Sequence, residues 1–261
     1  MSDTIFMIHG MWGGPWCWDN YKSYFEALGS PCLTPTLRLH DVNPQDPPPP
    51  GLGRLSLLDY AQDLEDQIRA LPQEPIIMGH SMGGLLAQIL AARGLGKAAV
   101  CITPATPWGI LGLRWSVMRS FWSAIWRLRF FSKPHLPTQA EAAYAMMHLL
   151  SPQEQRQAYS RFVHESGRAS AEIGFWLLDG RKASAVDAAG IKCPVLVVAG
   201  GQDRITPAAV VRKLEKKYRA MGRYKEFPEH AHWILAEPGW QDVAGYIHGW
   251  LKDAAKNNAG E

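Results

Sequence analysis

The segment that most constrains this chain is Pro75–Gly84, which reads PIIMGHSMGG. A short apolar run ends at Gly79, Ser81 stands between two glycines, and the spacing from Leu85 to Arg93 predicts a helix. A strand that turns directly into a helix leaves no room for side chains at Gly79 and Gly83, and it strains the residue between them. The G-x-S-x-G pattern therefore predicts a tight strand-to-helix turn with Ser81 at its tip as a candidate nucleophile.

The rest of the chain alternates between apolar runs and segments with helical spacing. The expected strands are 4–8, 31–36, 98–103, 193–199 and 224–227, and the expected helices are 16–28, 57–71, 208–221 and 240–256. A proline-rich loop at 40–54 separates two of them. This alternation predicts an α/β fold, with a mostly parallel sheet and helices on both of its faces.

The composition narrows the class of protein. A length of 261 residues suits one large α/β domain or a core with an inserted cap, and 47% hydrophobic with 20% charged residues is ordinary for a soluble enzyme. The net charge of +3 gives no reason to expect nucleic acid as a partner. The four cysteines show no C-x-x-C spacing and no secretory signal precedes the first strand, which favours reduced thiols and a cytoplasmic protein.

One stretch, 107–182, contains no convincing strand and is expected to be a helical insertion. The core would then consist of 1–106 and 183–261. Between 108 and 131, large apolar residues recur at three- and four-residue steps and predict an amphipathic helix: Leu111, Trp115, Met118, Trp122 and Ile125. The stripe suits a cap that lines a substrate pocket. The alternative is a lid whose Trp- and Arg-rich surface makes transient contact with lipid or micelles.

Taken together, these residues resemble the α/β-hydrolase superfamily over most of the chain outside the insertion. The order of the elements is similar: a His9-Gly10 loop after the first strand, the Ser81 turn, an acidic loop and a histidine loop. The early first strand is similar to that of compact members such as plant-type esterases and hydroxynitrile lyases. The resemblance implies an α/β-hydrolase fold with an inserted helical cap.

The resemblance also implies a catalytic triad. A serine needs a base to take its proton, and the family has a histidine after the last strand. His232 fits this position better than His230, which we expect to support the loop. Asp203, in the loop just after the strand 193–199, would orient His232. His230 and His232 could in principle bind a metal, but no third ligand is evident, so neither a metal nor a cofactor is expected.

Two backbone groups are expected to stabilise a developing oxyanion, namely the N–H of Met82 and, by resemblance to members with a His-Gly-x loop, the N–H of Met11. His9 is expected to shape that loop. The candidate pocket residues are Trp12, Trp115, Met118, Trp122 and Trp233.

The function expected from these residues is a serine carboxylesterase that hydrolyses apolar esters through an acyl-enzyme on Ser81, with acyl transfer to alcohols as a side activity. A lipase or perhydrolase relative remains an alternative, as does a small-molecule receptor on a hydrolase scaffold. Dehalogenases and epoxide hydrolases of this type carry aspartate in place of Ser81. Plant hydroxynitrile lyases carry lysine at the position of Trp233. The oligomeric state is left open.

Overall fold

The structure, a computed structural model, describes residues 3–111 and 130–258. Its centre is a six-stranded, entirely parallel sheet with the strand order β2-β1-β3-β4-β5-β6. The strands are β1 (Ile5–Ile8), β2 (Cys32–Leu33), β3 (Ile76–His80), β4 (Ala98–Ile102), β5 (Val195–Gly200) and β6 (Gly222–Phe227). All parallel strands point the same way, so the loops that follow them gather at one edge.

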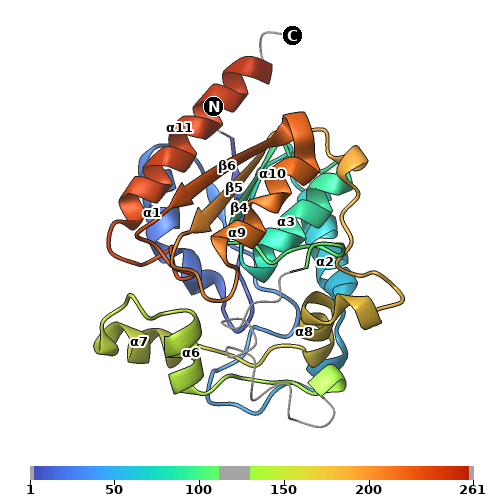
Figure 1. Ribbon diagram of the computed structural model, residues 1–261, viewed down its shortest axis with the longest axis vertical. Helices are drawn as coiled ribbons and strands as arrows, with labels where there is room; N and C mark the ends of the chain where they lie inside the picture. Colours follow the sequence, from blue (N-terminus) through green and yellow to red (C-terminus); the bar gives the residue numbers. More distant parts are fainter. Residues whose placement is uncertain (1–2, 112–129, 259–261) are drawn as a thin grey trace.

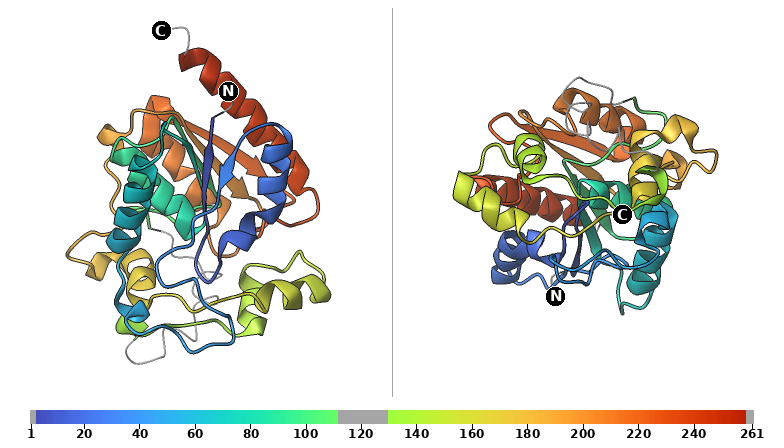
Figure 2. Two further views of the ribbon diagram at one scale, coloured as in Figure 1. Left: turned by 180° about the vertical axis from the view of Figure 1, so that it is seen from behind. Right: turned by 90° about the horizontal axis from the view of Figure 1, so that it is seen from below.

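Helices cover both faces of this sheet (Figures 1 and 2). One face carries α1 (Asp19–Ala27) and α11 (Trp240–Asn258). The other carries α2 (Leu57–Arg69), α3 (Met82–Ala92), α9 (Ala208–Val211) and α10 (Lys213–Tyr218). Short 3₁₀ turns complete this part: η1 (Pro15–Trp18), η2 (Leu52–Arg54), η5 (Ala188–Gly190) and η6 (Arg219–Met221).

The strands are buried on both faces, as expected for a parallel sheet. In β1, Phe6 and Ile8 pack into the core with α2 and α3, whereas Ile5 and Met7 pack into the core with α1 and α11. This period-2 alternation explains why the strands read as continuous apolar runs.

Three expected elements are shorter than their sequence patterns or are divided. The helix expected at 16–28 divides into η1 and α1. The strand expected at 31–36 is reduced to Cys32–Leu33, because Pro31 and Pro35 lack the N–H that a sheet ladder needs. The helix expected at 208–221 divides at Arg212 into α9 and α10, and a positive φ of 51° at Arg219 ends α10.

The segment between β4 and β5 includes the expected insertion, and its described part carries helices at one end of the molecule, while the C-terminal end of α11 lies at the other (Figure 1). It contains η3 (Phe130–Ser132), α6 (Gln139–Ala145), α7 (Pro152–Tyr159), α8 (Gly167–Gly174) and η4 (Trp176–Leu178). The only β pairing among its described residues is an isolated bridge between His135 and Glu165. Among the helices described, none is long and apolar enough to cross a bilayer.

Two buried carboxylates tie the α8 side of the insertion to the core, and we call them the carboxylate clamp (Glu165 and Glu172). Glu165 Oε2 lies 3.1 Å from His40 Nε2, and its Oε1 accepts a hydrogen bond from the Tyr60 hydroxyl at 2.8 Å. Glu172 accepts hydrogen bonds from Ser56 Oγ and from the Leu57 N–H, each at 2.8 Å. Because Ser56 is the N-cap of α2, a negative charge there also complements the helix dipole.

Candidate active site

The turn around Ser81 has the strained geometry that its glycines predict. Ser81 has φ 55° and ψ −118°, between the end of β3 and the first turn of α3. A Cβ on Gly79 would lie 2.0 Å from the Gly83 carbonyl oxygen, and a Cβ on Gly83 would lie 2.1 Å from the Ile8 carbonyl oxygen. Only glycine fits at either position, so the serine side chain stands clear of the sheet edge.

Three candidate side chains from distant loops meet at this edge. His232 Nε2 lies 3.0 Å from Ser81 Oγ, and His232 Nδ1 lies 2.8 Å from Asp203 Oδ2. Asp203 follows β5 by three residues, and His232 follows β6 by five residues. The chain positions expected for a nucleophile, a base and an acid are therefore joined by two consecutive hydrogen bonds.

The surroundings of Asp203 determine the tautomer of His232. Burial by itself would raise the pKa of Asp203, but the facing His232 imidazole and hydrogen bonds from His232 and Thr206 hold it below its ordinary value. Oδ1 accepts the backbone N–H groups of Ile205 and Thr206, both at 2.8 Å. An ionised carboxylate only accepts hydrogen bonds, so the neutral imidazole carries its proton on Nδ1 and offers a lone pair on Nε2 to Ser81.

The loop after β1 passes directly beside Ser81. A Cβ on Gly10 would lie 2.9 Å from Ser81 Cβ, so the backbone leading to Met11 approaches the serine closely. Met82 is the first residue of α3, and its N–H therefore has no partner within that helix. His9 accepts the Leu37 N–H on Nε2 at 3.2 Å, and burial lowers its pKa to about 3, which suits a neutral residue that shapes the loop.

His80, which the sequence analysis did not single out, supports the histidine loop. Its Nε2 donates to the His232 carbonyl oxygen at 2.8 Å, and its ring lies edge-on to Trp233. Burial, followed by the nearby His232, lowers the pKa of His80 to about 3, so the ring stays neutral. The 152 residues between donor and acceptor leave no local pattern by which sequence reasoning could have found this contact.

Glu237 is a second supporting residue that the sequence did not reveal. This fully buried carboxylate accepts the Ala231 N–H at 2.8 Å, and the same Oε2 lies 3.1 Å from His230 Nδ1. His230 therefore faces Glu237 while His232 faces Ser81, although only Ala231 separates them. The available signal was the Glu237-Pro238 pair that follows the apolar run 233–236, which is a weak one.

Two of the five candidate pocket residues, Trp12 and Trp233, lie within the described residues, and both are buried. Trp233 is buried against Trp16 and Phe162, with ring centroids 5.8 and 5.7 Å away. Trp12, also buried, has φ 60° and lies edge-on to His135. The remaining candidates lie outside the described residues: Trp115, Met118 and Trp122.

Comparison with known proteins identifies the fold. The family model described as "Alpha/beta hydrolase family" matches residues 5–244. Methylesterase 7 of Arabidopsis thaliana is 29% identical over 100 residues, which are 37% of this chain and 36% of that protein, so the match spans about a third of the relative.

Solved structures agree over nearly the whole chain. The crystal structure of a methylesterase protein from Arabidopsis superposes with a TM-score of 0.71 at 13% identity, covering 95% of this chain and 99% of that one. A pyrethroid hydrolase from Sphingobium faniae JZ-2 gives a TM-score of 0.72 at 17% identity, covering 98% and 100%. These likenesses and the parallel sheet confirm the predicted fold, and because the family model spans most of its length, the chain belongs to the alpha/beta hydrolase family.

Proposed function

We propose that this protein is a serine carboxylesterase that hydrolyses small apolar carboxylic esters. The observation that carries the proposal is the chain of two hydrogen bonds from Ser81 through His232 to Asp203, built on a strained turn that exposes the serine. Similarity to proteins named methylesterase and pyrethroid hydrolase supports an ester as substrate. A fold alone would leave the reaction open.

In the proposed mechanism, His232 Nε2 takes the proton of Ser81 Oγ as the oxygen attacks the ester carbonyl. The carbonyl oxygen gains negative charge, which the N–H groups of Met11 and Met82 stabilise. His232, held by the ionised Asp203, then gives its proton to the leaving alcohol. A water molecule activated by the same imidazole hydrolyses the acyl-enzyme. Where the pocket admits an alcohol in place of water, the acyl group passes to it instead.

We also propose that 107–182 form a cap over a core made of 1–106 and 183–261. Trp12 and Trp233, from the loops that follow β1 and β6, are assigned to the pocket wall. Their burial among other aromatic rings favours apolar acyl groups. Trp115, Met118 and Trp122 keep the pocket role that the sequence predicts.

The test is hydrolysis of p-nitrophenyl esters from acetate to palmitate by the wild type and by Ser81→Ala. We expect multiple turnovers in the wild type and a loss of at least about a thousandfold in kcat/KM in the variant. Ser160→Ala is the matched control, because Ser160 is exposed on the insertion. The acyl-length optimum separates an esterase from a lipase. A folded wild type that turns over no ester, or only once, would contradict the proposal and favour a receptor.

A further inference from the structure

The most exposed apolar side chains among the described residues lie on the insertion. Leu177 and Leu178 of η4 are 71% and 77% exposed, and Leu111 and Phe131 are 50% and 51% exposed. The two leucines sit on an ordered turn, since the Leu178 N–H donates to the Phe175 carbonyl at 2.8 Å. Exposed apolar residues that gather in this way mark an interaction site rather than ordinary surface.

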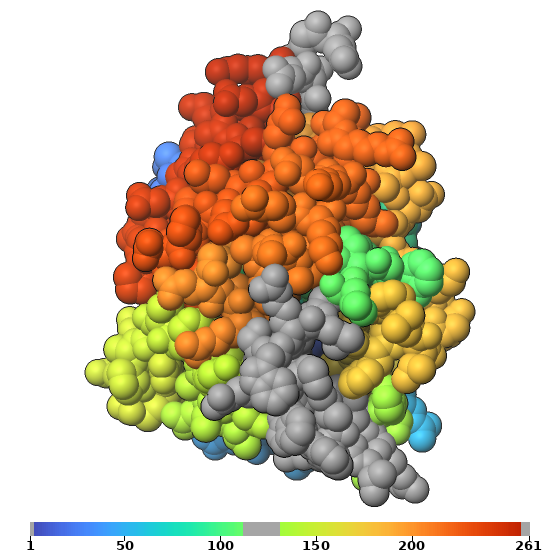
Figure 3. All heavy atoms as spheres, viewed as in Figure 1, coloured from blue at the N-terminus to red at the C-terminus, as the bar shows by residue number. Residues whose placement is uncertain are grey.

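Ring contacts connect the chain segments that carry these side chains, and we call the surface of these segments the apolar edge (Leu111, Phe131, Phe175, Leu177 and Leu178). Phe131 and Phe175 lie edge-on, with centroids 5.6 Å apart. Trp176 of the same turn packs edge-on against Trp108 at 5.3 Å. In Figure 3 the residues just before position 112 (green) lie beside the gold surface of the returning insertion.

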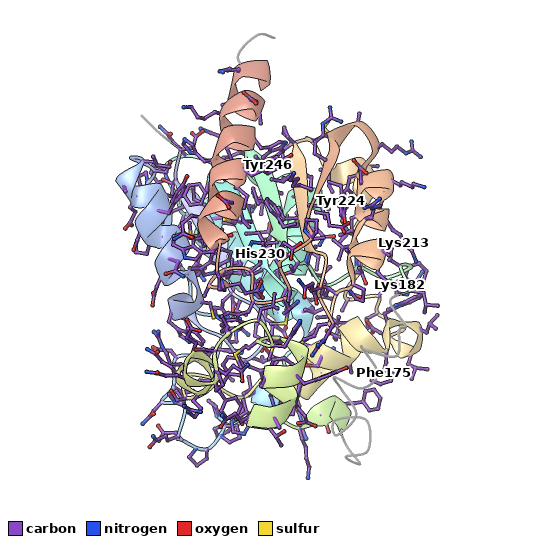
Figure 4. The ribbon with its side chains drawn as sticks, turned by 60° about the vertical axis from the view of Figure 1, so that its left-hand side comes forward. Phe175, Lys182, Lys213, Tyr224, His230 and Tyr246 are labelled. Atoms are coloured by element: carbon purple, nitrogen blue, oxygen red, sulfur yellow. The ribbon has the colours of Figure 1, made fainter. Side chains whose placement is uncertain are left out.

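Basic side chains border the apolar edge. Lys182 Nζ lies 4.6 Å above the Trp108 ring, and Lys213 Nζ donates to the Leu111 carbonyl at 3.4 Å. Figure 4 shows Lys182 and Lys213 on the same side of the molecule as Phe175. Lys133 is exposed two residues after Phe131, and Arg181 is exposed three residues after Leu178. We call these four cations the basic border (Lys133, Arg181, Lys182 and Lys213). Across residues 3–111 and 130–258, none of them forms an ion pair with a carboxylate.

The charge of the insertion points to an anionic partner. Residues 107–182 contain ten Lys and Arg but only five Asp and Glu, whereas the remainder of the chain has more acidic than basic residues. A second copy docking through the same surface would bring like charges together. Interfaces between proteins are also poor in lysine. Exposed apolar side chains that are flanked by Lys and Arg instead suit the surface of a bilayer with anionic headgroups.

We propose that the apolar edge docks on anionic lipid surfaces, with Leu177, Leu178 and Phe131 entering the acyl boundary and the basic border contacting headgroup phosphates. The chain connects the candidate site to this surface within a few residues, because the Ala105 N–H donates to the Ser81 carbonyl and Leu111 follows six residues later. Docking would therefore bring apolar molecules dissolved in the lipid close to the sheet edge. The proposal does not depend on the reaction at Ser81.

The test is co-sedimentation of the full chain with vesicles of phosphatidylcholine, alone or with 30% phosphatidylglycerol. We expect binding to the anionic vesicles that falls at least tenfold in Leu177→Asp/Leu178→Asp. We expect it to fall about twenty-fivefold in Arg181→Ala/Lys182→Ala, since each cation near the surface contributes about fivefold. High salt should weaken the wild type and have less effect on the second variant.

Leu28→Asp is the matched control, because Leu28 is 47% exposed at the end of α1 on the core and should leave binding unchanged. Circular dichroism verifies that each variant folds. The proposal is overturned if the wild type ignores both vesicles or if the leucine variant binds as well as the wild type. It is also overturned if light scattering shows a dimer that the leucine variant abolishes, which would identify a second copy as the occupant.

Discussion

The two sides of the insertion are attached to the core by different forces. On the α6 and α7 side, Met146, Met147 and Phe162 join the apolar cluster that contains Trp233. On the α8 side, the carboxylate clamp makes the contact through charges and hydrogen bonds. Apolar packing barely depends on pH, whereas a buried ion pair does. The comparison predicts that acid or base loosens the α8 side first.

The largest expected effect comes from breaking the apolar attachment. Phe162→Ala removes a buried ring that touches Tyr159, Trp16 and Trp233, so we expect a loss of about 3–5 kcal/mol in the free energy of unfolding. The loss should be nearly constant from pH 4 to 8 in urea titrations. Phe131→Ala, at an exposed ring, should cost less than about 0.5 kcal/mol. Equal costs for the two variants would refute the packing argument.

The second prediction breaks the clamp at Glu165. Glu165→Gln leaves His40 buried without its carboxylate partner, and we expect it to cost about 3 kcal/mol. Glu141→Gln, in the exposed capping box of α6, should cost less than about 1 kcal/mol. Chemical denaturation of both variants gives the comparison.

The cost of Glu165→Gln should depend on pH. Burial opposes the charge on Glu165, but the facing His40 and hydrogen bonds to the carboxylate lower its pKa below the ordinary 4.5. The stability that the charged Glu165 contributes is therefore complete above pH 4.5 and is lost as the pH falls through the lowered pKa. Burial likewise opposes the charge on His40, but Glu165 raises the pKa of His40 above the ordinary 6.5. The stability that the charged His40 contributes is therefore complete below pH 6.5 and is lost as the pH rises through the raised pKa. The difference between wild type and variant should be greatest between pH 4.5 and 6.5. A flat difference would show that the pair is not charged.

The third prediction concerns Glu237, which supports the loop that carries His232 by accepting the Ala231 N–H. Glu237→Leu leaves the Ala231 N–H and the His230 ring without an acceptor, which displaces His232. We expect kcat for ester hydrolysis to fall about a hundredfold, with little change in KM. Glu237→Gln keeps an acceptor and should recover most of the rate. A Gln variant as impaired as the Leu variant would instead indicate a need for the charge itself.

The smallest expected effect is at the second clamp contact. Ser56→Ala removes the N-cap of α2 and one donor to Glu172, and we expect it to cost about 1.5 kcal/mol. Ser151→Ala removes the N-cap of α7, whose capping box with Glu154 is exposed, and should cost about 0.5 kcal/mol. Thermal unfolding of the two variants side by side measures the contribution of the clamp.

The sheet and the candidate triad positions could be predicted because their signals are local. A strand reads as an apolar run, the turn at Ser81 as two glycines, and Asp203 and His232 as residues that follow strands. The structure brings these three side chains together, while their catalytic roles and the oxyanion donors stay predictions. The strand β2 is shorter than the sequence predicts, because Pro31 and Pro35 lack the N–H groups that would extend its hydrogen bonding.

The clamp and the loop supports could not be predicted in the same way. Glu165 and His40 are 125 residues apart, and His80 meets His232 across 152. Each is a single polar residue without periodicity, so nothing in its neighbourhood distinguishes it from a solvated one. Only the folded backbone determines that these groups are buried and which partners they meet.

The Trp108 N–H donates to the Ser184 carbonyl oxygen at 3.0 Å, so the chain leaves the sheet layer and returns to it at nearly the same point. A segment whose ends meet can be exchanged without altering the spacing of the strands on either side. Chimaeras that join 1–106 and 183–261 to the equivalent segment of another family member should therefore keep the sheet while acquiring a different substrate range. A graft that carries its own acidic residues at the positions of Glu165 and Glu172 would be accepted best.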